Sequence, residues 1–156
     1  QVVGEFAGGI GTAKAAQAGI GLVGLRNCGH LGRLGDWAEL VAMQFIRDQI
    51  RNASEITHRA AIGETPGWDI DYLDAQGTLQ RVEVKGTTAV SFASIDLTAG
   101  EMAAASLHAD AYWLYLVAAC LSESPLVQCV QHPASKFSTG SWIATPSLFS
   151  VRFARL

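Results

Sequence analysis

The sequence predicts an α/β fold in which a β-sheet carries helices on its faces. Three features predict it: apolar residues at helical spacing over 36–52, a hairpin pattern over 68–87, and a strongly apolar strand over 112–119. The chain has 156 residues, of which 49% are hydrophobic and 16% charged. These values are typical of a globular chain that buries a core of its own.

The helix over 36–52 is predicted from a capping residue and an apolar stripe. Asp36 is suited to the N-cap position. The expected buried positions of this helix are Leu40, Val41, Phe45, Ile46 and Ile50. A Gly- and Ala-rich amino-terminal extension precedes it, with a helix expected over 5–18, a strand over 20–25 and a loop over 27–35.

The hairpin consists of strands over 68–74 and 78–87, joined by Ala75-Gln76-Gly77. A three-residue loop that ends in glycine suits a type I turn closed by a left-handed residue. This turn places Asp74 opposite Thr78, and therefore Asp69 opposite Glu83 and Asp71 opposite Arg81. Directly opposed residues share a face of the sheet.

The second half of the chain is expected to alternate strands and helices. Residues 92–97 are predicted to form a strand, and Thr98 to cap a helix that ends near His108. Glu101, three residues after Thr98, completes a capping box. Further strands are expected over 112–119, 126–131 and 142–153, with a short helix over 133–137.

The hairpin register brings Asp69, Glu83 and Lys85 to one face, with Asp71 beside them. Two carboxylates about 4 Å apart repel by roughly 4 kcal/mol at an effective dielectric near 20, so a bound cation or a proton is needed between them. Oxygen ligands suit Mg²⁺ or Mn²⁺. Asp69, Glu83 and the Val84 carbonyl are the expected metal ligands, and Lys85 is the expected group that orients a water or stabilises charge at a phosphate. Asp71 is expected to support these ligands.

A surface hairpin with a cross-strand salt bridge is the other interpretation of the same residues. An acid two residues before a lysine is common in strands that do no chemistry. The sequence leaves both interpretations open.

Residues from about 39 to 156 resemble the Mrr-like branch of the PD-(D/E)xK nuclease superfamily, and in particular the carboxy-terminal domain of NO VEIN-type proteins, a domain of unknown function. The resemblance lies in Pro66-Gly67-Trp68-Asp69-Ile70, Val82-Glu83-Val84-Lys85-Gly86-Thr87, Ile95-Asp96-Leu97-Thr98 and Tyr112-Trp113-Leu114-Tyr115-Leu116-Val117. It implies a mixed sheet flanked by helices, a restriction-endonuclease-like core, with Asp69 and Glu83 as metal ligands and Lys85 as the catalytic lysine. It also implies an acid from the first helix, for which Glu39 is the candidate and Glu55 a weaker one.

Residues 1–42 resemble an internal stretch of the malate/L-lactate dehydrogenase family of NAD(P)-dependent oxidoreductases. The resemblance lies in Val3-Gly4-Glu5-Phe6-Ala7 and in Gly24-Leu25-Arg26-Asn27-Cys28-Gly29-His30-Leu31-Gly32. Cys28 stands where that family usually has serine. The interpretation is a fusion or fragment: a dehydrogenase-like piece over 1–42, followed by a nuclease-like domain over 43–156 whose first helix begins as early as 36.

The preferred expectation is a metal-dependent nuclease-like domain that acts on nucleic acid. A non-catalytic interaction module of the same fold and an NAD(P)-dependent oxidoreductase stay open as alternatives. Apolar runs are shorter than the roughly 20 residues that cross a bilayer, and the three cysteines have no paired spacing. We therefore expect a cytoplasmic protein with no membrane partner. No residue is assigned to cofactor binding, and the choice between monomer and homodimer stays open.

Overall fold

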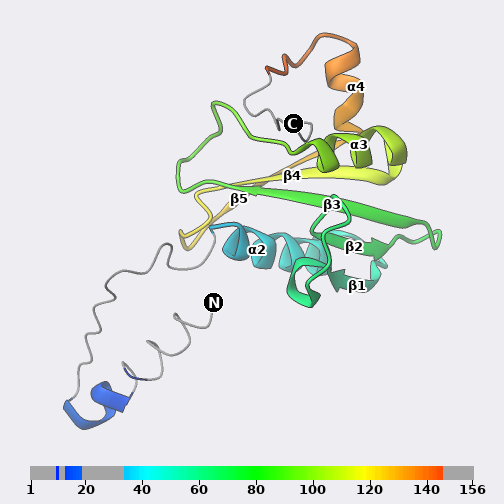
Figure 1. The fold of residues 1–156 in the computed structure, drawn as a ribbon. Coiled ribbons are helices and arrows are strands. Elements are labelled where there is room, and N and C mark those ends of the chain that lie inside the picture. The colour runs from blue at the N-terminus through cyan, green and yellow to red at the C-terminus, as the bar shows by residue number, and fades with distance from the viewer. Residues whose placement is uncertain (1–9, 11–12, 19–33, 146–156) are drawn as a thin grey trace, which may run out of the picture.

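The structure, a computed structural model, describes residues 10, 13–18 and 34–145. Its principal elements form one sheet with helices on both faces (Figure 1). In chain order they are α2 (Leu34–Gln49), β1 (Ser54–His58), the 3-10 turn η1 (Ala60–Ile62), β2 (Ile70–Leu73), β3 (Leu79–Gly86), α3 (Ala99–His108), the 3-10 turn η2 (Ala109–Ala111), β4 (Tyr112–Ala118), β5 (Leu126–Gln131) and α4 (Pro133–Ser138).

The sheet has five strands in the order β1-β2-β3-β4-β5. The β3–β4 pair is parallel and the other three pairs are antiparallel. Because parallel neighbours need a crossover, the chain passes through α3 between β3 and β4. Helix α2 covers one face, and α3 and α4 lie over the other (Figure 1). The predicted mixed sheet flanked by helices is confirmed.

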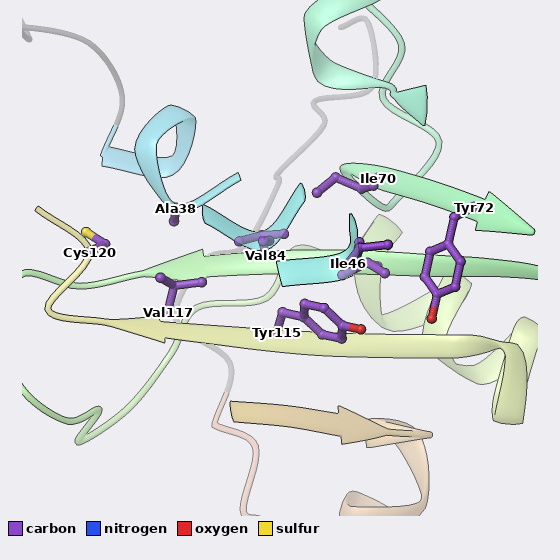
Figure 2. Packing of buried hydrophobic residues seen from close by; sticks show 10 residues of the cluster. Ala38, Ile46, Ile70, Tyr72, Val84, Tyr115, Val117 and Cys120 are labelled. Atoms are coloured by element: carbon purple, nitrogen blue, oxygen red, sulfur yellow. The ribbon is translucent and has the colours of Figure 1, made fainter. Parts of the chain in front are cut away.

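The main core lies between α2 and the sheet. Buried side chains from β2, β3 and β4 pack against the face of α2 that carries Ala38, Ala42 and Ile46. Figure 2 shows this packing for Ala38, Ile46, Val84 and Tyr115. Ala38, Ala42 and Ile46 are fully buried, so the backbone of α2 lies close to the strands. The predicted stripe is therefore wrong at Leu40, which is 55% exposed.

The hairpin register is confirmed where the strands pair. Asp71 lies opposite Arg81, as predicted. The Asp74 carboxylate accepts hydrogen bonds from the backbone N–H groups of Gln76 and Thr78, both at 2.9 Å, and Gly77 has φ +74°. The strands are shorter than predicted, because the β2–β3 pairing begins at Ile70.

Two predicted elements are wrong. Asp36 is not an N-cap, because α2 begins at Leu34 and places Asp36 in its first turn. Residues 92–97 form a loop and not a strand. The apolar side chains of that loop, Phe92, Ile95 and Leu97, pack against Leu114, Leu116 and Val130 on the sheet.

Several predictions fall partly or wholly outside the described residues. Residues 13–18 are helical, as predicted within 5–18. The predicted strand over 20–25 and most of the loop over 27–35 lie outside, as does 146–153 of the strand predicted over 142–153; residues 142–145 are not a strand. The boundary proposed at residue 42 falls inside α2. Within the described part of the chain, no helix is long and apolar enough to cross a membrane.

Gly67, in the loop before β2, packs closely against α3. We expect its replacement by alanine to lower the stability of the fold. Its φ is +102°, and an added Cβ would lie 2.9 Å from the Gly100 carbonyl oxygen. Strain and overpacking together predict a loss of about 3 kcal/mol in the free energy of unfolding. Gly63→Ala is the matched control, because Gly63 has φ +79° and open space around it. Urea unfolding checks the pair, and equal losses would contradict the steric argument.

Candidate functional site

Asp69 lies just before β2, where the main chain leaves the ladder. Its N–H donates to the carbonyl of Val82 at 2.9 Å, and its own carbonyl accepts from the Arg59 N–H at 2.7 Å. Its carboxylate Oδ2 accepts the Val84 N–H at 2.8 Å. The N–H and C=O of a strand residue point to the same side of the strand. The Val84 carbonyl therefore also faces the side on which Asp69 lies.

Glu83 and Lys85 stand two residues apart on β3, so their side chains share a face. Lys85 Nζ lies 2.6 Å from Glu83 Oε1 and 3.0 Å from Glu101 Oε2. Glu101 belongs to the first turn of α3, where the same oxygen accepts the Thr98 N–H of the capping box. One lysine therefore connects the central strand to the start of the crossover helix.

Burial and neighbouring carboxylates disfavour the ionised forms of Asp69 and Glu83. Burial, with a smaller effect of the Glu39 carboxylate, raises the pKa of Asp69 from 3.8 to about 6, against the lowering effects of the Val84 N–H and the Lys85 ammonium. Burial also raises the pKa of Glu83 well above its ordinary value, with repulsion by Asp69 as the next cause. The arrangement therefore favours a positive charge or a proton between these acids.

Lys85 and Glu101 form the part of the site that stays charged. Burial acts against the Lys85 ammonium, but Glu83 and Glu101 outweigh it and raise the Lys85 pKa. Burial would raise the pKa of Glu101, yet the Thr98 N–H, Lys85 and a hydrogen bond from Glu83 bring it below its ordinary value. Lys85 and Glu101 are therefore both ionised beside Glu83.

Glu39, the acid expected from the first helix, lies on α2 and is 2% exposed. Its Oε2 lies 2.5 Å from His58 Nε2 on β1. The Glu39 carboxylate is one of the groups that raise the pKa of Asp69. Glu55, the weaker candidate, is exposed near the start of β1.

Asp71 belongs to a neighbouring network. It is 1% exposed, and its Oδ2 accepts hydrogen bonds from Arg59 Nε at 2.7 Å and from the Trp68 indole N–H at 3.3 Å. Arg59 also pairs with Glu64 at 2.7 Å. Asp71 thus holds Trp68, which precedes Asp69, and Arg59, whose backbone N–H donates to the Asp69 carbonyl.

The structure adds Glu101 and His58 to the residues expected from the sequence. The capping box accounted for Glu101 completely, so nothing marked it as a partner of Lys85. One signal was present: a crossover helix starts near the carboxyl end of the strand that it follows, which is where Lys85 lies. His58 carried no such signal, because the sequence predicts no helix or strand between residues 52 and 68.

The donor set matches the chemistry of a hard divalent cation. Asp69, Glu83 and the Val84 carbonyl offer oxygen atoms where the start of β2 meets the central strand β3, and Mg²⁺ is bound by few protein oxygens and several waters. Within the described ranges, no group of three or more His, Cys, Asp and Glu side chains is arranged to hold a metal ion. The fit therefore rests on two carboxylates and a carbonyl.

A comparison with protein families matches residues 38–130 to the family described as Protein NO VEIN, C-terminal. The match covers more than half of the chain, and the chain therefore belongs to this family. It includes Glu39, Asp69, Glu83, Lys85 and Glu101, and does not extend to residues 1–37. No curated protein and no solved structure matches the chain. The dehydrogenase-like interpretation of residues 1–42 stays a prediction.

Proposed function

We propose that this member of the NO VEIN carboxy-terminal family is a Mg²⁺- or Mn²⁺-dependent nuclease-like domain that hydrolyses nucleic-acid phosphodiesters. The observation that carries the proposal is that Asp69, just before β2, lies beside Glu83 and Lys85 on the central strand β3. Buried acids whose pKa values are raised, beside a lysine that stays charged, suit a cation site next to an anionic substrate.

Asp69, Glu83 and the Val84 carbonyl would hold the cation. A bound Mg²⁺ supplies positive charge at the phosphoryl oxygens and lowers the pKa of a bound water. Lys85 would orient the attacking water and stabilise the negative charge that develops in the transition state. Glu101 keeps Lys85 charged and in place when Glu83 turns its oxygens to other partners.

Substrate access is available beside Lys85. A cavity of about 550 Å³ is lined by Lys85, Gly86 and the loop over 87–96. Lys85 therefore lies between the buried acids and an open space, with 21% of its side chain exposed. This volume suits a nucleotide-sized group.

A non-catalytic binding module of the same fold is the second candidate function. The observation that favours it is the double pairing of Lys85 with Glu83 and Glu101. A lysine held by two carboxylates has less charge to offer to a phosphate.

Cleavage of labelled DNA and RNA oligonucleotides with and without Mg²⁺ or Mn²⁺ tests the proposal. We expect cleavage with metal, none in EDTA, and loss of the metal-dependent rate in Asp69→Asn. Asp48→Asn is the matched control, since Asp48 is exposed on α2, which covers the opposite face of the sheet, and should leave cleavage intact. A parent protein that binds nucleic acid but does not cleave it with either metal supports the binding module instead.

A further inference from the structure

Arg81 lies on the same face of β3 as Glu83 and Lys85, at the edge of the site described above. Its guanidinium carbon is 5.1 Å from the centroid of the Trp68 ring. Trp68 is itself fixed: it packs against Ala104, Ala105 and Tyr112, and its indole N–H bonds to Asp71. The edge-on ring of His108 lies 5.3 Å from it. Arg81 therefore rests on a rigid aromatic surface.

The charge of Arg81 is not offset as its neighbours' charges are. Arg59 pairs with Asp71 and Glu64, and Lys85 pairs with Glu83 and Glu101. In the described part of the chain, Arg81 makes no ion pair, and its Nη1 donates only to the carbonyl of Leu79 at 3.1 Å.

Two further details leave this guanidinium available to an anion. Asp71 lies directly across from Arg81 in the ladder, but its carboxylate is bonded to Arg59. Among the described residues, Arg81 Nε is a buried donor without a hydrogen-bond partner. Because Nε is enclosed by protein, an anionic ligand would bind at the terminal nitrogen atoms of this half-buried side chain, of which only Nη1 has a protein acceptor among the described residues.

The position of Arg81 on β3, close to Glu83, favours a polyanion that also reaches the proposed cation site. Two residues along a strand span about 6.6 Å, so Arg81 lies one short step from Glu83. Trp68, beneath it, directly precedes Asp69. The chain has a net charge of −3, so its average field does not attract a polyanion. A local cation is then needed to hold one against the site.

We propose that Arg81, supported by Trp68, binds a phosphodiester group next to the one that the site cleaves. The choice of a nucleic acid as ligand rests on the proposed function. A planar guanidinium with several donors matches phosphate oxygens, and stacking on the indole fixes its orientation before the ligand arrives. The contact is to the backbone, so it carries affinity and not sequence preference.

Fluorescence anisotropy of labelled DNA and RNA oligonucleotides in EDTA, over a range of salt concentrations, tests the inference. We expect Arg81→Gln to weaken binding roughly tenfold and to reduce the slope of log affinity against log salt by about one. Arg81→Lys keeps the charge, so its slope should stay near that of the parent while its affinity falls. Arg47→Gln is the charge-matched control, because Arg47 is exposed on α2, which covers the opposite face.

The outcomes separate this inference from the proposed cleavage. Unchanged affinity and slope in Arg81→Gln, an equal loss in Arg47→Gln, or a parent that binds neither oligonucleotide would each overturn it. If Arg81→Gln loses binding while the parent cleaves nothing, Arg81 stands as a phosphodiester contact of a binding module and the cleavage proposal falls. A thermal melt of each variant, with Arg81→Lys as the conservative change, shows that the loss does not come from unfolding. Differing losses on DNA and RNA would identify the preferred backbone.

Discussion

Lys85→Ala should abolish cleavage and lower the stability of the fold at the same time. Lys85 is the cation between Glu83 and Glu101, and its removal leaves both carboxyl groups without their positive partner. Loss of one group that stabilises transition-state charge costs about a hundredfold or more in rate. The free energy of unfolding should fall by about 2 kcal/mol, less than for a fully buried pair, because Glu83 can take up a proton. Single-turnover cleavage and urea unfolding measure the two effects.

Two variants on α3 separate the lysine's position from the helix cap. Glutamine serves in a capping box as glutamate does, so Glu101→Gln keeps the start of α3 but removes the charge that faces Lys85. We expect reduced cleavage with little loss of stability. Thr98→Ala removes the cap and leaves Lys85 paired, so stability should fall by about 1 kcal/mol with cleavage preserved. Identical behaviour of both variants would show that Glu101 acts only on the helix.

The part of the site that could be predicted from the sequence is the part fixed by short-range structure. Asp74 and Gly77 determine the turn, and the turn determines which residues of the hairpin face one another. The alternation of Ile70 and Tyr72 with acids then assigns the faces. Asp69, Glu83 and Lys85 follow from these local rules alone.

The missed partners come from elements distant in the chain. The pairing of Lys85 with Glu101 depends on how the crossover helix returns to the sheet. The pairing of Glu39 with His58 depends on β1, an edge strand with an irregular register and a residue, Glu55, at φ +50°. Such a strand has little hydrophobic alternation, so a sequence pattern does not reveal it.

The strand wrongly predicted over 92–97 has a similar explanation. Its apolar residues do face the sheet, which is why they have a strand-like pattern. A strand, however, must pair along an edge of the sheet, and this loop packs over a face, against side chains of β4 and β5. The sequence pattern therefore predicted correctly that these side chains are buried, but it could not predict whether the backbone of this segment pairs with a strand.

The stability of the metal-free protein should fall as the pH rises. The folded-state pKa of Asp69, about 6, lies above its ordinary value of 3.8, and that of Glu83 is also raised. Between the ordinary and the raised pKa the folded state binds more protons than the unfolded state, so the contribution of these two groups to stability is full below about pH 4 and is lost as the pH rises through 6 and above. Each group contributes at most about 1.4 kcal/mol per pH unit.

Glu83→Gln should flatten this decline, because the amide holds its hydrogen bonds without a proton to lose. Glu123→Gln is the control, since Glu123 is exposed. The difference between variants is the readout, because His108, whose pKa is lowered by burial, changes stability in the opposite direction. Mg²⁺ should restore the parent's stability most at high pH, where the carboxylates are ionised and free to bind it. Urea unfolding from pH 5 to 9 measures both effects, and a decline as steep in Glu83→Gln as in the parent would contradict the raised pKa of Glu83 on which the cation site depends.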